Sequence, residues 1–259
     1  MLKIENVEVT GWEAAIRGMR NPMNSWAKSD SYHYTGYQGD EDKYVIGPDD
    51  HRVMMLLSKE GSVDAKYRRM INVTLDITAP LYWWKEFDAY KVGTVANSCS
   101  TMHKIHAKEF TLDDFSCEHL FRDPAEIIAP NIDIPDFSNR EEEIEWNYER
   151  GAYSSYEDGN EFENWVASDY AMDLLNTTIS AMNYYRSKFL ETKDKRYWWQ
   201  LIQLLPSSYN QRRTVQVNYE VLAGIYPKRK DHKLDEWHVF CDWIKTLPYS
   251  EIITLEENE

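Results

Sequence analysis

The stretch NVTLDITA at residues 72–79, followed directly by PLYWWKEFDAYKVGTVANSCSTMH at residues 80–103, organises the chain. In its first part, apolar side chains alternate with polar ones, which is the pattern of a strand with one buried face. Pro80 cannot continue a ladder of strand hydrogen bonds, and proline suits the first position of a helix. We therefore predict a strand over 72–79 and a helix after Pro80.

The stretch changes character after Gly93. Small hydrogen-bonding side chains then dominate: Thr94, Asn97, Ser98, Ser100 and Thr101. Short polar side chains and exposed backbone amides can approach phosphate oxygens closely, so the run suits a ligand-binding loop. An ordinary loop built from Asx and Ser/Thr turns fits the same residues. Composition alone leaves both interpretations open.

Composition sets the broad class. The chain has 259 residues, of which 42% are hydrophobic, which is enough for a full core. Aromatic residues reach 14%, and this favours a buried aromatic core or surfaces on which flat ligands stack. The net charge is −15. Nucleic acid is therefore not expected as a partner, because binding its phosphates needs a basic face.

The cysteines and histidines indicate neither disulfides nor a metal site. The three cysteines form no CxxC pair, and no secretory signal begins the chain, so we expect reduced thiols and a cytoplasmic protein. No run approaches the roughly 18 apolar residues of a membrane span. His103 and His106 are the only close histidine pair, and we predict no metal site from them.

Hydrophobic periodicity predicts the other elements. We expect a strand over 2–9 and helices over 11–19, 52–59, 165–192, 198–205, 212–226 (ended by Pro227) and 234–247. Residues 21–50 are polar and rich in Tyr, Gly, Asp and Ser, which indicates a long loop or an ordered excursion. Strands followed by helices predict an α+β fold, an antiparallel or mixed sheet flanked by helices, with long helices in the C-terminal half. We expect one domain over 1–259 with insertions at 21–50 and 123–164.

Two segments resemble the flavin-dependent thymidylate synthases. In that family a strand ends in Ala-Pro, a Trp-containing helix follows, and the motif Arg-His-Arg-x-x-Ser-x-Asn-x-x-Ser comes next. The first segment matches at Ala79-Pro80, at Trp83 and Trp84, and at Asn97-Ser-Cys-Ser100. The second matches, in step and without a gap, at Leu205-Pro206, Gln211-Arg212, Val217-Asn-Tyr-Glu-Val-Leu222, Arg229, His232 and Glu236-Trp237.

The chain also departs from the family pattern. With one inserted residue allowed, the Arg-His-Arg half falls on Ala89-Tyr90-Lys91. The family arginine that contacts flavin is Glu220, and the one that contacts the substrate phosphate is Ile202. The histidine expected before the Ala-Pro strand is absent, although Arg68 and Arg69 lie near that position. Losing cations weakens every charge-assisted bond to a phosphate-rich cofactor.

The resemblance implies a reaction and an assembly. Members of the family are homotetramers with sites at subunit interfaces. NADPH reduces the bound FAD, and the flavin mediates transfer of a one-carbon unit from methylenetetrahydrofolate to C5 of dUMP. The protein then supplies position and electrostatics, while the cofactor carries the hydride.

The resemblance also assigns roles to residues. Arg229 would be the catalytic residue, facing the pyrimidine of dUMP with its rigid fork of donors. Arg212 and Glu86 would join Arg229 in binding the substrate, with Arg212 at its phosphate. The cofactor-binding residues would be Lys91, Thr94, Asn97, Ser98, Ser100, Thr101 and Asn218, the last bonded to the flavin.

Two other functions fit the same sequence. The chain could be a nucleotide-binding or nucleotide-modifying homologue that has lost flavin chemistry, which the eroded Arg-His-Arg half and Glu220 favour. It could also be a non-catalytic interaction protein in which the fold and the tetramer survive and the pocket does not. The arginines would then be exposed helix charges, as most arginines are.

Overall fold

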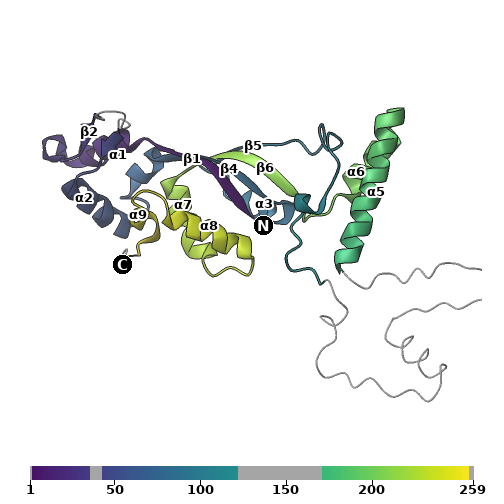
Figure 1. Ribbon diagram of the computed structural model, residues 1–259. Coiled ribbons are helices and arrows are strands. Elements are labelled where there is room, and N and C mark those ends of the chain that lie inside the picture. The colour runs from purple at the N-terminus through teal and green to yellow at the C-terminus, as the bar shows by residue number, and fades with distance from the viewer. Residues whose placement is uncertain (1, 36–42, 122–170, 257–259) are drawn as a thin grey trace, which may run out of the picture. The chain divides into compact units, whose positions relative to one another are not determined.

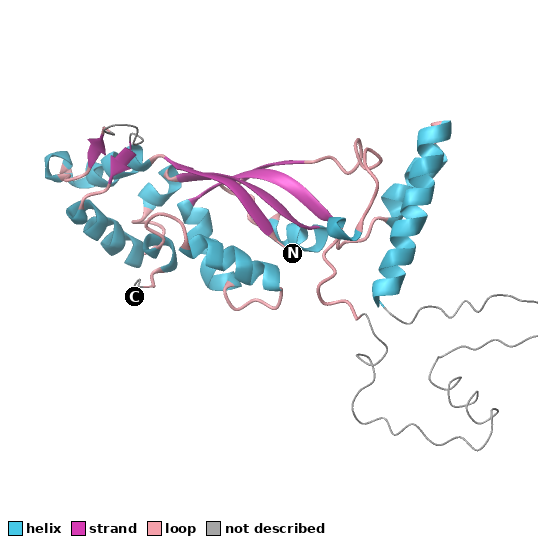
Figure 2. Cartoon of the chain, viewed as in Figure 1, coloured by secondary structure: helices cyan, strands magenta, loops and turns pink. Residues whose placement is uncertain are grey.

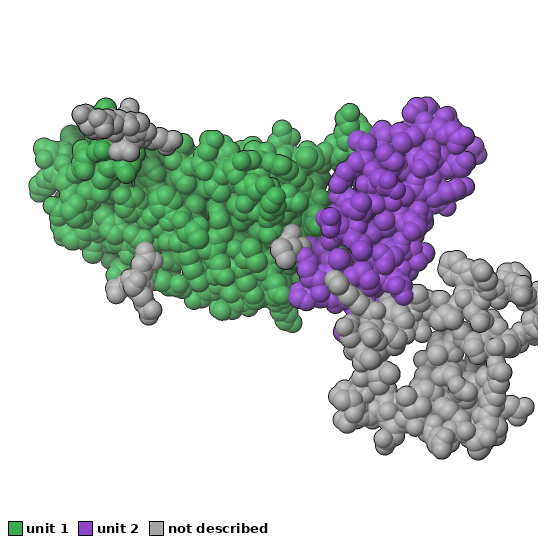
Figure 3. Space-filling view, viewed as in Figure 1, with its two compact units in different colours: residues 1–104, 206–259 green, residues 105–205 purple. Residues whose placement is uncertain are grey.

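The computed structural model describes residues 2–35, 43–121 and 171–256 (Figure 1). They divide into two compact units, residues 1–104 with 206–259 and residues 105–205, coloured separately in Figure 3. The first unit holds β1 (Lys3–Thr10), α1 (Trp12–Arg20), η1 (Asn21–Met23), η2 (Trp26–Lys28), β2 (Tyr32–Tyr34), β3 (Lys43–Val45), α2 (Pro48–Lys59), η3 (Lys66–Met70), β4 (Asn72–Pro80), α3 (Leu81–Phe87), β5 (Val95–Ser98), β6 (Asn210–Asn218), α7 (Tyr219–Arg229), α8 (Asp235–Lys245) and α9 (Glu251–Thr254). The second holds η4 (Leu112–Asp114), α5 (Ala171–Thr192) and α6 (Lys195–Leu204).

The first unit is built on a four-stranded antiparallel sheet in the order β1-β4-β6-β5 (Figure 2). Helices α3, α7 and α8 lie on one face of it (Figure 1). This arrangement confirms the predicted α+β fold class.

The stretch 72–103 begins as predicted. The apolar side chains of β4 are buried and its polar ones are half-buried, so the strand has one core face. Pro80 ends β4 with extended backbone, and α3 starts at the next residue. Trp83, Trp84 and Phe87 of α3 are buried, and they pack with Trp237 and Phe240 of α8 into an aromatic core.

The predicted helix over 212–226 is wrong in its first half. Residues 210–218 form β6, which pairs with β4 on one side and β5 on the other, and only 219–229 are helical. Val215 and Val217 are buried at strand spacing, and β-branched residues pack well on a pleated surface. Pro227 does not end the helix, since α7 continues to Arg229.

The polar run after Gly93 is not wholly a loop. Residues 95–98 form β5, an exposed edge strand that pairs with β6. The described residues of 21–50 form an ordered excursion, the second of the two structures expected. They hold two short 3₁₀ helices, the β2–β3 pair and the first turn of α2. The expected insertion 123–164 lies outside the described residues.

The remaining helices agree with their predictions. Those expected over 11–19, 52–59, 198–205 and 234–247 correspond to α1, α2, α6 and α8. The described part of the helix expected over 165–192 is α5, and residues 165–170 lie outside the described chain. Within the second unit, the Asn183 side chain of α5 makes two hydrogen bonds with the Phe110 backbone. Its Oδ1 accepts from the Phe110 N–H, and its Nδ2 donates to the Phe110 carbonyl, each at 2.9 Å.

Candidate functional site

Glu86 and Arg229 come together on the helical face of the sheet. Glu86 lies near the end of α3, and Arg229 is the last residue of α7. The Arg229 guanidinium donates from Nη1 to Glu86 Oε2 at 2.5 Å and from Nε to the Tyr90 hydroxyl at 2.9 Å. It also lies over the ring of Trp237, 4.5 Å from the ring centroid. Two of the three residues that the resemblance assigns to the substrate are thus neighbours.

A single oxygen of Glu86 organises the rest of this cluster. Besides Arg229, its Oε2 accepts from Trp237 Nε1 at 3.0 Å and lies 3.4 Å from His232 Nε2. The other His232 nitrogen, Nδ1, accepts from the backbone N–H of Leu234 at 3.1 Å. The two contacts together fit the neutral imidazole with its proton on Nε2, because Nδ1 must then be an acceptor.

The cluster leaves one oxygen and one nitrogen without a hydrogen bond among the described residues. Glu86 Oε1 and Arg229 Nη2 make no hydrogen bond with the described residues. The Glu86 side chain keeps 35% of its surface exposed and that of Arg229 keeps 17%, so both remain within reach of a ligand. A carboxylate oxygen beside a guanidinium N–H matches a planar group that has an N–H next to a carbonyl.

Arg212 is not part of this cluster, because it lies on the opposite face of the sheet. Its Nη2 donates to Asp76 Oδ2 at 2.6 Å, and Thr214 Oγ1 and Asn6 Nδ2 also donate to the Asp76 carboxylate. Hydrogen bonds from Thr214, then from Asn6 and Arg212, hold the pKa of Asp76 well below its usual range. Asn97 is paired with Thr214 in the ladder and therefore shares this open face.

Arg213 occupies the helical face instead. Its guanidinium lies 4.1 Å from the Trp84 ring centroid, and its Nη1 donates to Asp88 at 2.8 Å. Sequence reasoning missed Arg213, and it gave Tyr90 no role in a site. The signal for Arg213 was the period-2 alternation of β6, which a helical assignment of the same residues concealed.

The expected cofactor residues lie along the edge of the sheet and beside the start of α7. Lys91 is exposed, and Thr94 begins the run that continues through β5. Gly93 has a φ of 81°, and a Cβ there would lie 3.0 Å from Asn218 Nδ2. The Asn218 carbonyl oxygen accepts from Val221 N at 3.0 Å, so this residue caps α7 and does not lie within a helical face.

The remaining expected cofactor residues are the three hydroxyl side chains at and beyond the end of β5. Ser98 is the last residue of the strand, and it is exposed. Ser100 and Thr101 follow it, and the Ser100 hydroxyl accepts from His103 N at 3.0 Å.

FAD, which the resemblance implies, fits these residues through hydrogen bonds better than through charge. Hydroxyls and amides over 94–101 suit phosphate oxygens, but Lys91 is the one cation among the expected cofactor residues. Glu220, the position of a flavin-contacting arginine in the family, is used internally: its Oε2 accepts from Arg68 Nε at 2.8 Å. The expected cofactor residues are therefore rich in hydroxyl and amide groups and include one cation.

Two other kinds of site are absent from the described part of the chain. No three His, Cys, Asp or Glu side chains gather there as a metal-binding group. None of the helices described is long and apolar enough to cross a membrane.

Comparison with known proteins places the fold. No family model matches the chain, and no curated protein matches it by sequence. Among solved structures, thymidylate synthase X (ThyX) from Helicobacter pylori with FAD and dUMP is similar at a TM-score of 0.58 and 12% identity, over 99% of this chain and 98% of that one.

Two further structures have the same architecture. A second structure of the flavin-dependent thymidylate synthase ThyX from Helicobacter pylori, complexed with FAD and dUMP, gives a TM-score of 0.57 at 13% identity, over 98% of each chain. The UMP/dUMP methylase PolB from Streptomyces cacaoi, bound with 5-Br dUMP, gives 0.55 at 13% identity, over 98% of this chain and 95% of that one. The fold of this protein is thus the fold of ThyX and PolB.

Proposed function

We propose that the protein binds a pyrimidine nucleoside monophosphate of the dUMP type, with the base at Glu86 and Arg229. The observation that carries the proposal is that Glu86 Oε1 and Arg229 Nη2 make no hydrogen bond with the described residues, so that an acceptor and a donor are left for a ligand. Uracil presents an N3–H donor flanked by two carbonyl acceptors, so one edge of the base can satisfy both groups. The fold neighbours support the ligand class, because they bind dUMP or a 5-bromo analogue of it.

The site is held ready for a base by its own packing. Trp237 supports one face of the Arg229 guanidinium, and Tyr90 and Glu86 fix its in-plane orientation. A cation stacked on an indole and bonded on two edges has little rotamer freedom left to lose when a ligand arrives. His232 Nε2 lies 3.4 Å from Glu86 Oε2, the oxygen that also accepts from Arg229, so this contact leaves Oε1 to the ligand.

Isothermal titration with dUMP, UMP and dCMP tests the base assignment. Cytosine has an unprotonated N3 that would face the Glu86 carboxylate, so dCMP should bind at least about tenfold more weakly than dUMP. Arg229→Ala should abolish dUMP binding while the circular dichroism spectrum stays unchanged. Lys245→Ala, which alters an exposed cation on α8, is the matched control. Equal affinity for dUMP in Arg229→Ala and the parent protein would overturn the assignment.

The phosphate contact is tested separately. The resemblance assigns it to Arg212, which lies on the open face of the sheet and pairs with Asp76. If Arg212 contacts the phosphate, Arg212→Ala should weaken dUMP binding and leave deoxyuridine binding unchanged. Equal losses for both ligands, or no loss, would remove Arg212 from the site.

Methylation of dUMP to dTMP with FAD, NADPH and methylenetetrahydrofolate is the second candidate function. The donor-rich run 94–101 and the FAD in the ThyX structures favour it. The protein should be mixed with FAD, passed through a desalting column and scanned for flavin absorbance. Retained flavin, followed by NADPH oxidation that depends on dUMP, would support the enzyme.

The same scan separates the other outcomes. A colourless protein that binds dUMP would be a nucleotide-binding homologue without flavin. A colourless protein that binds no nucleotide would be an interaction protein. Light scattering on the purified chain tests the homotetramer that the resemblance implies.

A further inference from the structure

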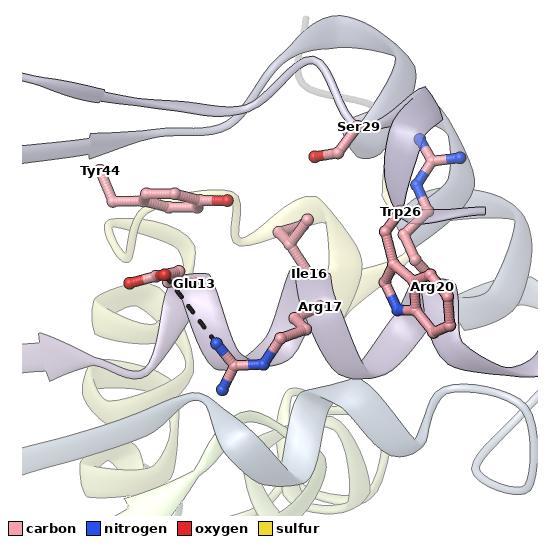
Figure 4. A pocket seen from close by; sticks show the side chains of 7 residues that line it. All are labelled: Glu13, Ile16, Arg17, Arg20, Trp26, Ser29 and Tyr44. Atoms are coloured by element: carbon pink, nitrogen blue, oxygen red, sulfur yellow. Dashed lines mark ion pairs between the residues drawn. The ribbon is translucent and has the colours of Figure 1, made fainter. Parts of the chain in front are cut away.

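A cavity lies at the other end of β4 from Glu86 and Arg229. Its volume is about 220 Å³, and its lining residues come from α1, η2 with the residue after it, and β3 (Figure 4). They are Glu13, Ile16, Arg17, Arg20, Trp26, Ser29 and Tyr44. Helix α1 packs against η3, which precedes β4, whereas α3 follows β4. The cavity therefore shares no residue with the cluster around Glu86.

One wall of the cavity is backed by a buried hydrogen-bonded network. Arg20 is 7% exposed, and its Nε and Nη2 both donate to Asp50 Oδ1, at 2.8 and 2.7 Å. The other oxygen of Asp50 accepts from the hydroxyls of Ser29 and Ser31. Arg20 Nη1 makes no hydrogen bond with the described residues, so a buried guanidinium that lines the cavity still has a donor to offer.

Charges of both signs stand nearer to solvent. Glu13 lies 3.9 Å from Arg17 Nη1 (Figure 4). Its other oxygen lies 3.2 Å from His33 Nε2. Arg17 is thus matched by Glu13, and Arg20 is matched by Asp50, which is buried and does not itself line the cavity, so these four charges sum to zero. A net anion would meet Glu13 and a net cation would meet Arg17, so a neutral ligand with separated charges fits best.

Apolar surface fills the space between the charges. Ile16 is 2% exposed, while Trp26 keeps half of its surface exposed beside the cavity. The indole is held in place, because Trp26 Nε1 donates to Asn21 Oδ1 at 2.8 Å. The Tyr44 ring packs edge-on against His33 on the side of Glu13. An exposed but oriented indole beside a buried isoleucine is a contact surface for a small apolar group.

We propose that this cavity binds a small zwitterion of the α-amino-acid class with an apolar side chain. The ligand's carboxylate would meet Arg17, and its ammonium would meet the neighbouring Glu13. Its side chain would lie against Ile16 and Trp26. The size agrees, since drug-sized ligands take pockets of roughly 300–1,000 Å³ and this cavity is smaller.

Titration with L-phenylalanine, L-leucine and L-tryptophan tests the proposal. At least one should bind saturably with one ligand per chain. The amino acid that binds best is then compared with two analogues, an amine that lacks the carboxylate and a carboxylic acid that lacks the ammonium. Each analogue should bind at least about tenfold more weakly, because one charge-assisted bond is lost. With L-phenylalanine these analogues are 2-phenylethylamine and 3-phenylpropionate.

Two variants and a control make the test specific. Glu13→Gln should weaken the amino acid about tenfold and leave the carboxylic acid analogue unchanged, because only the ammonium contact is removed. Trp26→Ala should weaken the binding of the amino acid and of both analogues that lack one charge. Lys28→Ala, on the same 3₁₀ helix but outside the cavity, should behave like the parent protein. If none of the three amino acids binds, or if Glu13→Gln and Trp26→Ala bind as the parent does, the proposal is wrong.

Discussion

Arg68 and Glu220 form a buried ion pair between residues far apart in the chain. Arg68 Nε lies 2.8 Å from Glu220 Oε2, and the side chains are 5% and 18% exposed. Arg68 also donates from Nη1 to the Ile252 carbonyl at 3.0 Å, which ties η3 to α9. The carboxylate at the position of a family arginine therefore neutralises a cation of its own chain. In the sequence, Glu220 stands for the loss of an arginine that would bind a ligand. In the structure, Glu220 forms an ion pair with Arg68 inside the first unit.

Removing one partner of this pair should destabilise the first unit strongly. Glu220→Ala leaves the Arg68 charge buried with one carbonyl partner, and we expect a loss of about 3 kcal/mol in the free energy of unfolding. Urea unfolding measures it. Asp242→Asn, which breaks an exposed pair with Lys245 on α8, is the control and should change stability little. The double replacement Arg68→Met with Glu220→Leu should recover most of the loss. A double variant as unstable as Glu220→Ala would show that the unpaired charge is not the cause.

The buried carboxylate of Asp50 should make stability depend on pH in acid. Burial alone would raise the pKa of Asp50, but hydrogen bonds from Ser29, Ser31 and Arg20 outweigh it and hold the pKa below its usual value. A group with a lowered folded pKa stabilises above its unfolded pKa of about 3.9. This stabilisation is then lost as the pH falls through the folded pKa.

Urea midpoints measured from pH 7 down to acid test this expectation. Asp50→Asn should be less stable than the parent protein at neutral pH, and the two curves should converge as the pH falls below about 4. Asp49→Asn changes the exposed neighbour on α2, so its curve should run parallel to that of the parent. A constant difference between Asp50→Asn and the parent across the whole range would contradict the assignment.

Gly11 and Gly61 separate backbone strain from steric overlap. Both have a left-handed φ, 95° and 98°, which costs an L residue about 1–2 kcal/mol. A Cβ at Gly61 would meet nothing within 4 Å, whereas a Cβ at Gly11 would lie 2.0 Å from the Met70 carbonyl oxygen. Gly11→Ala should therefore lower the thermal midpoint at least twice as far as Gly61→Ala. Equal shifts would mean that α1 moves away from η3 without cost.

The cysteines should differ sharply in reactivity. Cys99 is exposed and Cys241 is buried in α8. Burial raises the pKa of the Cys241 thiol to about 11, so little thiolate forms near neutral pH. Iodoacetamide should label Cys99 in the native protein and Cys241 only after unfolding, as read by mass spectrometry of the digested chain. Native labelling of Cys241 at the rate of Cys99 would mean that α8 opens from the core.

The sequence by itself determined those elements whose pattern allowed a single interpretation. The alternation over 72–79 specified β4, because a strict period of 2 does not fit a helix. The proline after it specified the start of α3, because proline lacks the N–H that a strand ladder needs and suits the first turn of a helix. The apolar face of 234–247 specified α8 in the same way. The family resemblance assigns both Glu86 and Arg229 to the substrate, and the structure brings these two together.

Only the tertiary structure decided what residues 210–229 do. Val215, Val217, Val221 and Leu222 fit a helical face and a strand alternation almost equally well. Pairing with β4 on one side and β5 on the other makes 210–218 a strand, and this choice assigns neighbouring residues to opposite faces. Arg212 consequently lies on the open face and Arg213 on the helical face. The role of Glu220 as an ion-pair partner is also decided by the tertiary structure. Its partner Arg68 is far away in the sequence, and only folding brings the two side chains together.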